Sequence, residues 1–192
     1  MPFTPMRIHG AYVFEPVKFT DKRGQFQESF KLSLLESELG FGFTVKQVNQ
    51  SISAKGVIRG IHFADNPPGQ AKYVSCPKGD VWDFVVDLRV NSPTFGQWEG
   101  VELSGSNGKS VLIGEGLGHG FLALEDDSVV NYLCSEEYNP KTEHQINPLD
   151  GDLAIDFLAA AASFGIKDFL LSDQDNLAPT FSQAQKFRLL PL

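Results

Sequence analysis

Short runs of alternating hydrophobic and polar residues fill the middle of the chain, from about residue 43 to residue 157. Gly, Pro, Asn and Asp separate these runs, and short strands with such spacing are typical of an all-β sandwich or barrel. The chain lacks the strand–helix rhythm of a βαβ fold. The expected strands are FTVKQVNQS (43–51), GVIRGIHF (56–63), KYVSCPKG (72–79), DVWDFVVDLR (80–89), WEGVELSG (98–105), KSVLIG (109–114), HGFLAL (119–124) and VVNYLCSEEY (129–138).

The run at residues 80–89 shows the alternation most clearly. Because successive side chains of a strand point to opposite faces, its aromatic and carboxylate residues are expected on different faces. One face would carry Trp82, Phe84, Val86 and Leu88, and the other Val81, Asp83, Val85 and Asp87.

Helical periodicity is confined to the flanks. The spacing of Leu32, Leu35 and Leu39 predicts a helix over residues 31–39, ended by Gly40, and another short helix is expected at 182–187. The alanine run at 159–162 has helix propensity but lies near aromatic residues and a glycine, so a helix and a packed irregular segment both remain open. Without repeats or low-complexity linkers, residues 1–192 are expected to form one all-β domain with short flanking helices.

Composition limits the classes of function. With 42% hydrophobic and 21% charged residues the chain is typical of soluble globular proteins, and no apolar run approaches the ~20 residues that span a bilayer. The N-terminus carries no export signal, so a cytoplasmic protein without a membrane partner is expected. A net charge of −8 argues against nucleic acid as a partner but not against a small anionic ligand, whose site needs only a few Arg and Lys. Cys76 and Cys134 lack CxxC spacing and are expected to be reduced, structural thiols.

The run VIRGIHF (57–63) places Arg59 and His62 in an otherwise apolar strand. Both side chains are costly to bury, so both require partners. Their spacing of three puts them on opposite faces unless Gly60 marks a β-bulge. A lone histidine of this kind is more commonly a hydrogen-bonded structural residue than a catalyst, so its neighbours decide its role.

The segment GEGLGHGF (114–121) resembles the second sequence motif of the cupin fold. In metal-binding cupins the first motif supplies a close pair of histidines and a glutamate, whereas the matching segment here, GIHFAD, has one histidine. The ligand set for a metal ion is therefore incomplete, and we expect no metal site.

Ordered blocks along nearly the whole chain resemble the dTDP-4-dehydrorhamnose 3,5-epimerase family. They are FTDKRGQFQESF (19–30), VKQVNQS (45–51), GVIRGIHF, QAKYVSCPKGDVWDFVVDLRVNSPTFGQWEGVELS (70–104), GEGLGHGFLAL, YNP (138–140) and LSDQD (171–175). The resemblance implies a cupin-type jelly roll that works without metal or other cofactor. It also implies a homodimer that exchanges N-terminal strands, and a dTDP-4-keto-6-deoxyhexose substrate.

The chemistry of such a substrate explains the residue types. Its C4 ketone acidifies the protons on C3 and C5, so inversion needs a base, an acid on the opposite face and stabilisation of the enolate. By resemblance, His62 is the base, Asp175 orients its ring, Lys72 holds the O4 oxyanion and Tyr132 is the acid. Asp83 is the second choice for a carboxylate in the pocket.

The resemblance also implies contacts to the rest of the substrate. Arg59 would grip the diphosphate bidentately. Phe19 and Tyr138 would stack on the thymine base, although ordinary aromatic packing remains open for both, and Glu28 would contact ligand unless it lies on a solvated strand face. The other expected substrate contacts are Arg23, Gln47, Asn49 and His119.

Departures from the family pattern leave alternatives open. Gly114, Leu117 and Gly118 replace the usual proline, phenylalanine and alanine before His119, which would loosen that segment and reshape the sugar pocket. Some relatives of the same architecture invert only C3 or only C5. We favour an enzyme that inverts both carbons, because the acid and the base are both present. A metal-dependent cupin enzyme and a non-catalytic sugar-nucleotide-binding jelly roll are the more remote readings.

Overall fold

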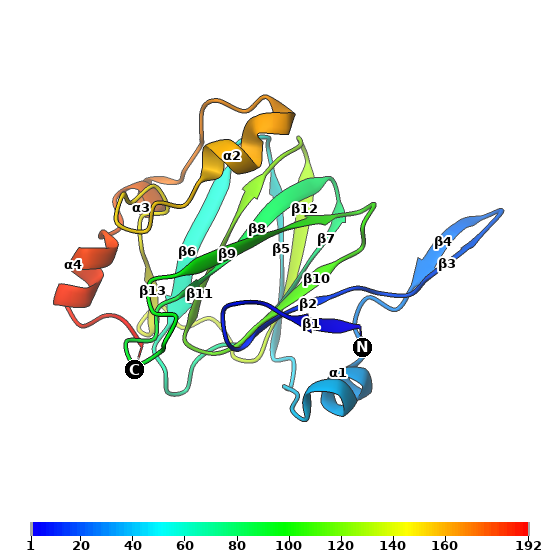
Figure 1. Cartoon of the computed structure of the whole chain (residues 1–192), viewed down its shortest axis with the longest axis horizontal. Helices are drawn as coiled ribbons and strands as arrows, with labels where there is room; N and C mark the ends of the chain where they lie inside the picture. Colours follow the sequence, from blue (N-terminus) through cyan, green and yellow to red (C-terminus); the bar gives the residue numbers. More distant parts are fainter. Residues whose placement is uncertain (1, 192) are drawn as a thin grey trace.

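Two antiparallel sheets pack face to face in the computed structural model, which describes residues 2–191 (Figure 1). The six-stranded sheet has the spatial order β1 (Phe3–Pro5), β2 (Ala11–Phe14), β10 (Ser110–Ile113), β7 (Lys72–Lys78), β12 (Ser128–Cys134) and β5 (Gln47–Ser53). The five-stranded sheet has the order β13 (Glu143–Gln145), β6 (Ile58–Ala64), β11 (Leu117–Ala123), β8 (Asp80–Asp87) and β9 (Trp98–Ser104).

The predicted all-β jelly roll is confirmed. The eight expected strands correspond to β5 through β12, with ends shifted by a few residues. Strands β1 to β4 and β13 were not predicted, because runs of three or four residues are too short to show alternation.

An apolar core fills one part of the space between the sheets. Val74 and Val130 from the six-stranded sheet meet Val85 and Phe121 from the five-stranded sheet. On β8 these inward positions alternate with aromatic residues that face the other way, as the sequence predicted. The remaining inter-sheet space, beside β5 and β6, carries polar side chains and forms the cavity described below.

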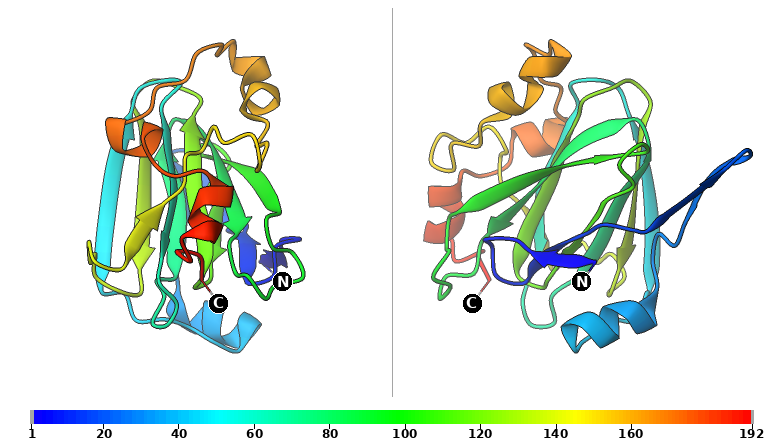
Figure 2. Two further views of the ribbon diagram at one scale, coloured as in Figure 1. Left: turned by 90° about the vertical axis from the view of Figure 1, so that its left-hand side faces the viewer. Right: turned by 45° about the vertical axis from the view of Figure 1, so that its right-hand side comes forward.

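The C-terminal segment covers the outer face of the five-stranded sheet (Figure 2). Phe84 and Phe63 pack there against Phe157, Ile155 and other residues that follow β13. The alanine run begins as a helix and tightens into a 3₁₀ turn, which Gly165 ends at φ +67°. The elements of this segment are α2 (Phe157–Ala161), η1 (Ala162–Phe164), α3 (Asp173–Asn176) and α4 (Phe181–Lys186), and the last confirms the helix expected at 182–187.

The predicted helix at 31–39 is α1 (Leu32–Leu39), which covers the outer face of the six-stranded sheet. Leu35 is fully buried there beside Tyr73 and Phe14. Gly40 ends the helix in the left-handed conformation, with its N–H donating to the Glu36 carbonyl.

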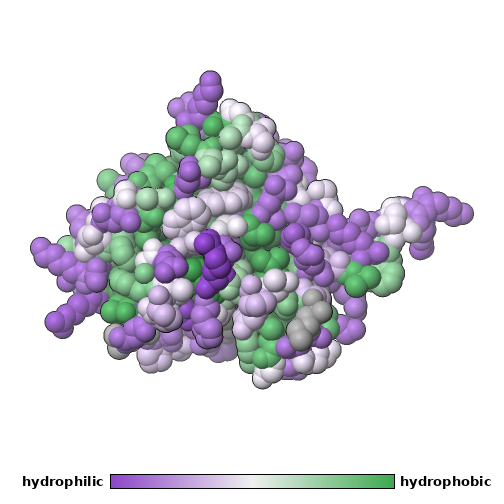
Figure 3. Space-filling model, viewed as in Figure 1, coloured by the Kyte–Doolittle hydropathy of each residue, from purple (hydrophilic) through white to green (hydrophobic). Residues whose placement is uncertain are grey.

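A hairpin of β3 (Lys18–Asp21) and β4 (Gly24–Gln27), called the arm below, stands away from both sheets in Figures 1, 2 and 3. Lys18 Nζ donates to the Ser106 carbonyl at 2.6 Å and holds the base of the arm against the turn after β9. Beyond this base the arm is exposed, including the rings of Phe19 and Phe26, whose centroids lie 6.3 Å apart.

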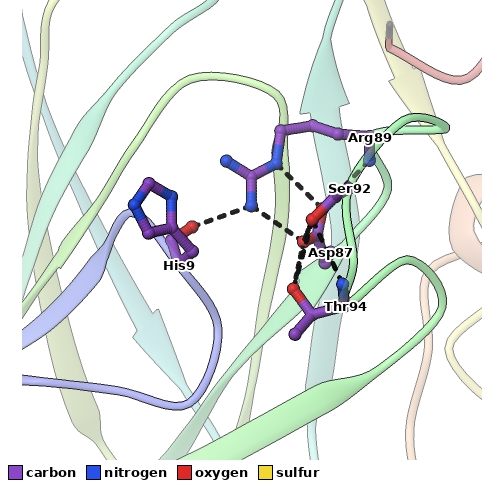
Figure 4. A network of polar contacts seen from close by, with 5 residues as sticks. All are labelled: His9, Asp87, Arg89, Ser92 and Thr94. Carbon is purple, nitrogen blue, oxygen red and sulfur yellow. Dashed lines mark hydrogen bonds and ion pairs between the residues drawn. The ribbon is translucent and has the colours of Figure 1, made fainter.

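Asp87 at the end of β8 organises the loop that follows it (Figure 4). Its buried carboxylate accepts hydrogen bonds from the guanidinium of Arg89 and from the hydroxyls of Ser92 and Thr94. Arg89 also donates to the His9 carbonyl at 2.7 Å, which ties the N-terminal loop to this end of the sandwich. Asp87 therefore has a structural role, whereas Asp83 on the same strand face lies near the cavity.

Both cysteine side chains are buried and free, as the sequence predicted. Among residues 2–191 no helix has the length and apolar character needed to cross a membrane.

Candidate active site

A cavity of about 270 Å³ opens between the two sheets beside β5, β6 and β13. Eight of the twelve residues assigned to a site from the sequence line it: Gln47, Asn49, Arg59, His62, Lys72, His119, Tyr132 and Tyr138. Seven others line it that were not predicted: Ser51, Gln70, Phe121, Glu143, His144, Gln145 and Gln174.

The two sheets provide opposite walls of this cavity. His62 and His119 come from β6 and β11 of the five-stranded sheet, where they are cross-strand partners. Lys72 and Tyr132 come from β7 and β12 of the six-stranded sheet. A ligand between the walls would therefore have an imidazole on one side and a phenol on the other.

A bulge in β6 brings Arg59 and His62 to the same face. The step from His119 to Phe121 spans two residues of β11, whereas the matching step from His62 to Arg59 spans three residues of β6. Gly60 absorbs the extra residue at φ +121°, and a Cβ there would lie 2.6 Å from the Gly120 Cα. The predicted conflict between alternation and a shared site is resolved by this bulge.

His62 is paired with Asp175, as the resemblance implied. The Nε2 of the imidazole lies 2.8 Å from Asp175 Oδ1, and Asp175 is buried behind the ring. Ser172 caps α3 by accepting from the Asp175 N–H at 3.0 Å. Burial alone would raise the pKa of Asp175, but the hydrogen bond with His62 and the contacts with Ser172 and the Gly60 N–H hold it below its ordinary value. Asp175 is therefore an anion able to orient an imidazole and stabilise its protonated form.

Lys72 and Tyr132 are both perturbed by burial. Desolvation lowers the pKa of the buried Lys72 ammonium, and the carboxylate of Glu143 partly offsets this effect. Desolvation likewise raises the pKa of Tyr132, whereas the positive charge of Arg59 acts in the opposite direction. The cavity thus holds a lysine in a site of low polarity, where the attraction of its ammonium form for an oxyanion is stronger than in water.

A second histidine–carboxylate pair lies next to the first. His119 Nε2 is 2.8 Å from Asp83 Oδ2, and both side chains are buried. Burial raises the pKa of Asp83, an effect that His119 and Lys72 partly offset. Asp83 thus lies behind His119 and does not itself line the cavity.

Polar side chains at the rim are already ordered by one another. Gln47 Nε2 donates to Asn49 Oδ1 at 2.8 Å, and Gln47 Oε1 accepts from the Tyr138 N–H at the same distance. Arg59 donates to the Ser53 hydroxyl at 3.0 Å and so links β6 to β5. The Tyr138 ring is exposed and free to stack against a planar ligand.

Comparison with known proteins assigns the family. The family profile described as dTDP-4-dehydrorhamnose 3,5-epimerase matches residues 5–183. The chain belongs to this family. Its predicted class, an isomerase that epimerises sugars in deoxysugar biosynthesis, is thereby confirmed.

Three members of the dTDP-4-dehydrorhamnose 3,5-epimerase family show how close the similarity is. A dTDP-4-dehydrorhamnose 3,5-epimerase of Mycolicibacterium smegmatis is 47% identical over 97% of this chain and 89% of the relative. An epimerase structure from Mycobacterium tuberculosis superposes with a TM-score of 0.93 at 43% identity, covering 100% of this chain and 94% of that one. A 3'-monoepimerase of Streptomyces bikiniensis, solved in complex with dTDP-quinovose, has a TM-score of 0.91 at 44% identity, covering 97% and 91%.

Three predicted substrate contacts of this epimerase do not reach its own cavity. Phe19 and Arg23 lie on the arm, where Arg23 pairs with Asp21, and Glu28 follows β4 and pairs with Lys31. None of the three lines the cavity between the sheets of the described chain. A contact with substrate would require that they act in another copy of the protein.

The cavity residues missed by sequence reasoning come mainly from β13 and α3. Glu143, His144 and Gln145 form a strand of three residues, too short for a visible pattern. Gln174 had one usable signal, its position next to Asp175 in LSDQD. Across residues 2–191, no group of three His, Cys, Asp or Glu side chains is arranged to hold a metal ion.

Proposed function

We propose that this chain inverts C3 and C5 of a dTDP-4-keto-6-deoxyhexose by metal-independent proton abstraction and reprotonation through an enolate, as a dTDP-4-dehydrorhamnose 3,5-epimerase. One observation carries the proposal: His62, backed by Asp175, and Tyr132 lie on opposite walls of one cavity that also holds the buried Lys72. Inversion requires this arrangement of base, acid and cation around the ring.

His62 is the base in this proposal. A neutral imidazole takes the proton from carbon near neutral pH, and the Asp175 carboxylate 2.8 Å away stabilises the imidazolium that results. In a 4-keto sugar with the gluco configuration the hydrogens on C3 and C5 project from the same face of the ring. One base can therefore serve both carbons.

Tyr132 is the acid that returns a proton to the opposite face. Its pKa, raised by burial, makes the phenol a reluctant acid toward water but a suitable donor to a basic enolate carbon. Lys72 offsets the negative charge that develops on O4. A crystal structure of the S. bikiniensis enzyme with one histidine changed to asparagine and one tyrosine to phenylalanine, in complex with dTDP, is in keeping with roles for these residue types.

The remaining predicted residues would bind the nucleotide and diphosphate. Arg59 offers the diphosphate a guanidinium at the mouth of the cavity, and Tyr138 offers the thymine a face for stacking. His119, Gln47 and Asn49 would donate or accept hydrogen bonds to ligand oxygens.

A single-position epimerase is the second candidate. The 3'-monoepimerase of S. bikiniensis is about as similar to this chain as the 3,5-epimerases are. We favour double inversion because the full set of base, acid and lysine lines the cavity and both carbons flank the same ketone.

The proposal includes the assembly and setting of the enzyme. We infer a homodimer, because Phe19, Arg23 and Glu28 can contact substrate only in the cavity of a second copy. We also infer one domain, whose extreme residues 1 and 192 lie outside the described residues, and a cytoplasmic setting.

Deuterium exchange tests the proposed reaction. The protein is incubated in deuterated water with dTDP-4-keto-6-deoxyglucose, and C3 and C5 are followed by NMR. Deuterium at both carbons is the expected result, deuterium at one carbon would indicate a single-position epimerase, and deuterium at neither would refute the proposal.

His62→Ala is expected to abolish exchange at both positions, whereas Tyr132→Phe should allow some exchange while impairing inversion. His9→Ala is the control. It changes an exposed histidine that does not line the cavity, and it should leave exchange unchanged.

The rival readings predict other outcomes. Stoichiometric iron, manganese or zinc in the purified protein, with loss of activity on chelation, would support a metal-dependent cupin enzyme. Tight ligand binding without exchange of sugar protons would support a non-catalytic binding protein.

A further inference from the structure

We propose that Gln145 and Gln174 form an amide clasp that positions Asp175, and through it the imidazole of His62. This inference rests on the proposed function, in which His62 is the base. It assigns a role to two cavity residues on β13 and α3 that act through Asp175 and not on the substrate.

The short helix α3 lacks an apolar face that could fix its position. It has four residues, and Asp175 is its one buried residue. Leu177, which follows the helix, is 82% exposed and does not anchor it. The chain before α3 is held by Leu170, which exchanges backbone hydrogen bonds with Gly56 and Ile58, and by Leu171, which packs against the core. The helix itself relies on polar contacts with the segment around β13, since a single helical turn has little stability of its own.

The clasp supplies two of these contacts. Gln174 Nε2 donates to Gln145 Oε1 at 2.9 Å, and Gln145 Nε2 lies 3.4 Å from the backbone carbonyl oxygen of Gln174. Asn147 extends the same attachment, because its Nδ2 donates to the Asn176 carbonyl at 3.0 Å. Residues 145 and 147 thus bind the helix at two successive points.

The clasp and the histidine–carboxylate pair form a closed ring. Gln145 is the cross-strand partner of His62 in the pairing of β13 with β6. Gln174 is covalently adjacent to Asp175, whose Oδ1 lies 2.8 Å from His62 Nε2. Every link from His62 through Gln145, Gln174 and Asp175 back to His62 is therefore fixed by a covalent bond, a strand pairing or a hydrogen bond.

Amides suit this role because each has both a donor and an acceptor. The clasp adds no charge beside Asp175, so the carboxylate keeps its full attraction for a protonated imidazole. Without the clasp, α3 would keep the link through Asn147 but lose the contact nearest to Asp175. The carboxylate would then leave the imidazole for part of the time, and a misplaced base costs rate more than it costs binding.

The test compares Gln145→Ala, Gln174→Ala and the double variant in the deuterium-exchange assay with dTDP-4-keto-6-deoxyglucose. We expect kcat to fall by on the order of tenfold with KM changed less than about twofold, and the double variant to be no slower than either single one. In an Asp175→Asn background, removal of Gln174 should cause no further loss. Gln145→Glu keeps the acceptor oxygen for Gln174 but loses the donor and adds a charge near Asp175, so it should recover only part of the kcat that Gln145→Ala loses.

A matched control and a spectroscopic readout separate positioning from folding. Asn176→Ala changes another exposed amide on α3 that is bound only through its backbone, and it should leave kcat unchanged. NMR of histidine labelled with ¹⁵N, recorded without substrate, should show the His62 signal altered in the clasp variants while the other histidine signals are retained. If Gln145→Ala or Gln174→Ala loses all native signals and so does not fold, the other of the two variants and Gln145→Glu test the inference.

Three results would overturn the inference. The first is a rise in KM with kcat unchanged, which would make the two amides substrate contacts. The second is an additive loss of kcat in the double variant. The third is a His62 NMR signal that is unaltered in the clasp variants. Failure of the proposed function is distinguishable, because the wild-type protein would then show no exchange at all.

Discussion

Of the three histidine–carboxylate pairs beside the cavity, His62–Asp175 and His119–Asp83 differ in exposure and in the direction in which the carboxyl pKa is shifted, while His144 pairs with Asp65. The His62 side chain is 42% exposed, whereas that of His119 is 9% exposed. The pKa of Asp175 is lowered by its hydrogen bonds, while burial raises the pKa of Asp83, whose Oδ1 is buried without a hydrogen-bond partner in the described chain. Environments that shift the pKa values of two carboxyl groups in opposite directions suit them to different roles, and the accessible pair, in which the pKa of Asp175 is lowered, is the one suited to proton abstraction.

Individual site residues were predictable where the sequence gives them an unusual neighbourhood. Arg59 and His62 were conspicuous as polar residues in an apolar run, whereas the roles of Lys72, Tyr132 and Asp175 were implied by the resemblance to the epimerase family. Gln145 and Gln174 were missed, since a glutamine in a loop or short strand is common and its partner is distant in the sequence. The pairing of His119 with Asp83 also depends on two strands meeting in space.

Asp87 makes the stability of the protein depend on pH. Burial favours its protonated form, but the hydrogen bonds from Arg89, Ser92 and Thr94 outweigh burial and lower its pKa. A carboxyl with a lower pKa in the folded state stabilises the fold above its unfolded pKa of about 4, and this contribution is lost as the pH falls through the folded value.

Asp87→Asn is therefore expected to reduce the free energy of unfolding by about 3 kcal/mol at neutral pH. Thermal unfolding is measured from about pH 7 to about pH 3. The difference in unfolding temperature between wild type and variant should become smaller toward the acid end of this range. Asp21→Asn, which removes an exposed ion pair with Arg23, is the control and should leave the unfolding temperature unchanged. A difference in unfolding temperature between wild type and Asp87→Asn that stays constant down to the lowest pH would contradict this account.

At the scale of elements, the sheets could be predicted and their irregularities only in part. Strands β5 to β12 have enough residues for alternation to be visible, and β8 carries its two faces as expected. The possible bulge at Gly60 was visible as a conflict between spacing and shared function, but only the strand pairing decided it. The segment before His119, expected to be loose, is instead part of β11, where a Cβ on Gly118 would lie 2.7 Å from Ile61 Cγ2.

The bulge predicts that Gly60 tolerates no side chain. Gly60→Ala would place a methyl group 2.6 Å from the Gly120 Cα at a φ of +121°, so β6 must shift away from β11. We expect a loss of about 2 kcal/mol or more in the free energy of unfolding, together with loss of deuterium exchange, because Arg59 and His62 would no longer share a face. Chemical denaturation measures the first effect and NMR the second.

Gly151→Ala is the matched control for this substitution. A Cβ at Gly151 meets nothing within 4 Å, so the free energy of unfolding should change by less than about 0.5 kcal/mol and exchange should persist. A Gly60→Ala protein as stable and as active as the Gly151→Ala protein would show that the bulge is not required.

At the scale of the whole molecule, the arm is the feature that one chain leaves unexplained. It extends into solvent (Figures 1 and 3). Phe19 and Phe26 on the arm are exposed, and edge strand β5 carries the exposed apolar side chains of Val48 and Ile52. Exposed apolar groups on a projecting hairpin and on an open sheet edge are typical of association between subunits. The sequence indicated which arm residues resemble substrate contacts, but it could not indicate that they lie away from the cavity of their own chain.

The proposed dimer predicts complementation between two inactive variants. Arg23→Ala alters the arm and leaves the cavity intact, whereas His62→Ala removes the base and leaves the arm intact. If each arm serves the cavity of its partner, a mixed dimer contains one complete site, so random exchange of equal amounts should restore about a quarter of wild-type deuterium exchange. The control mixes His62→Ala with Tyr132→Phe, both in the cavity wall, and should give no more inversion than the separate proteins do. Sedimentation of the wild-type protein as a monomer, or a mixture of the first pair that stays inactive after subunit exchange, would contradict an arm that acts in the partner's site.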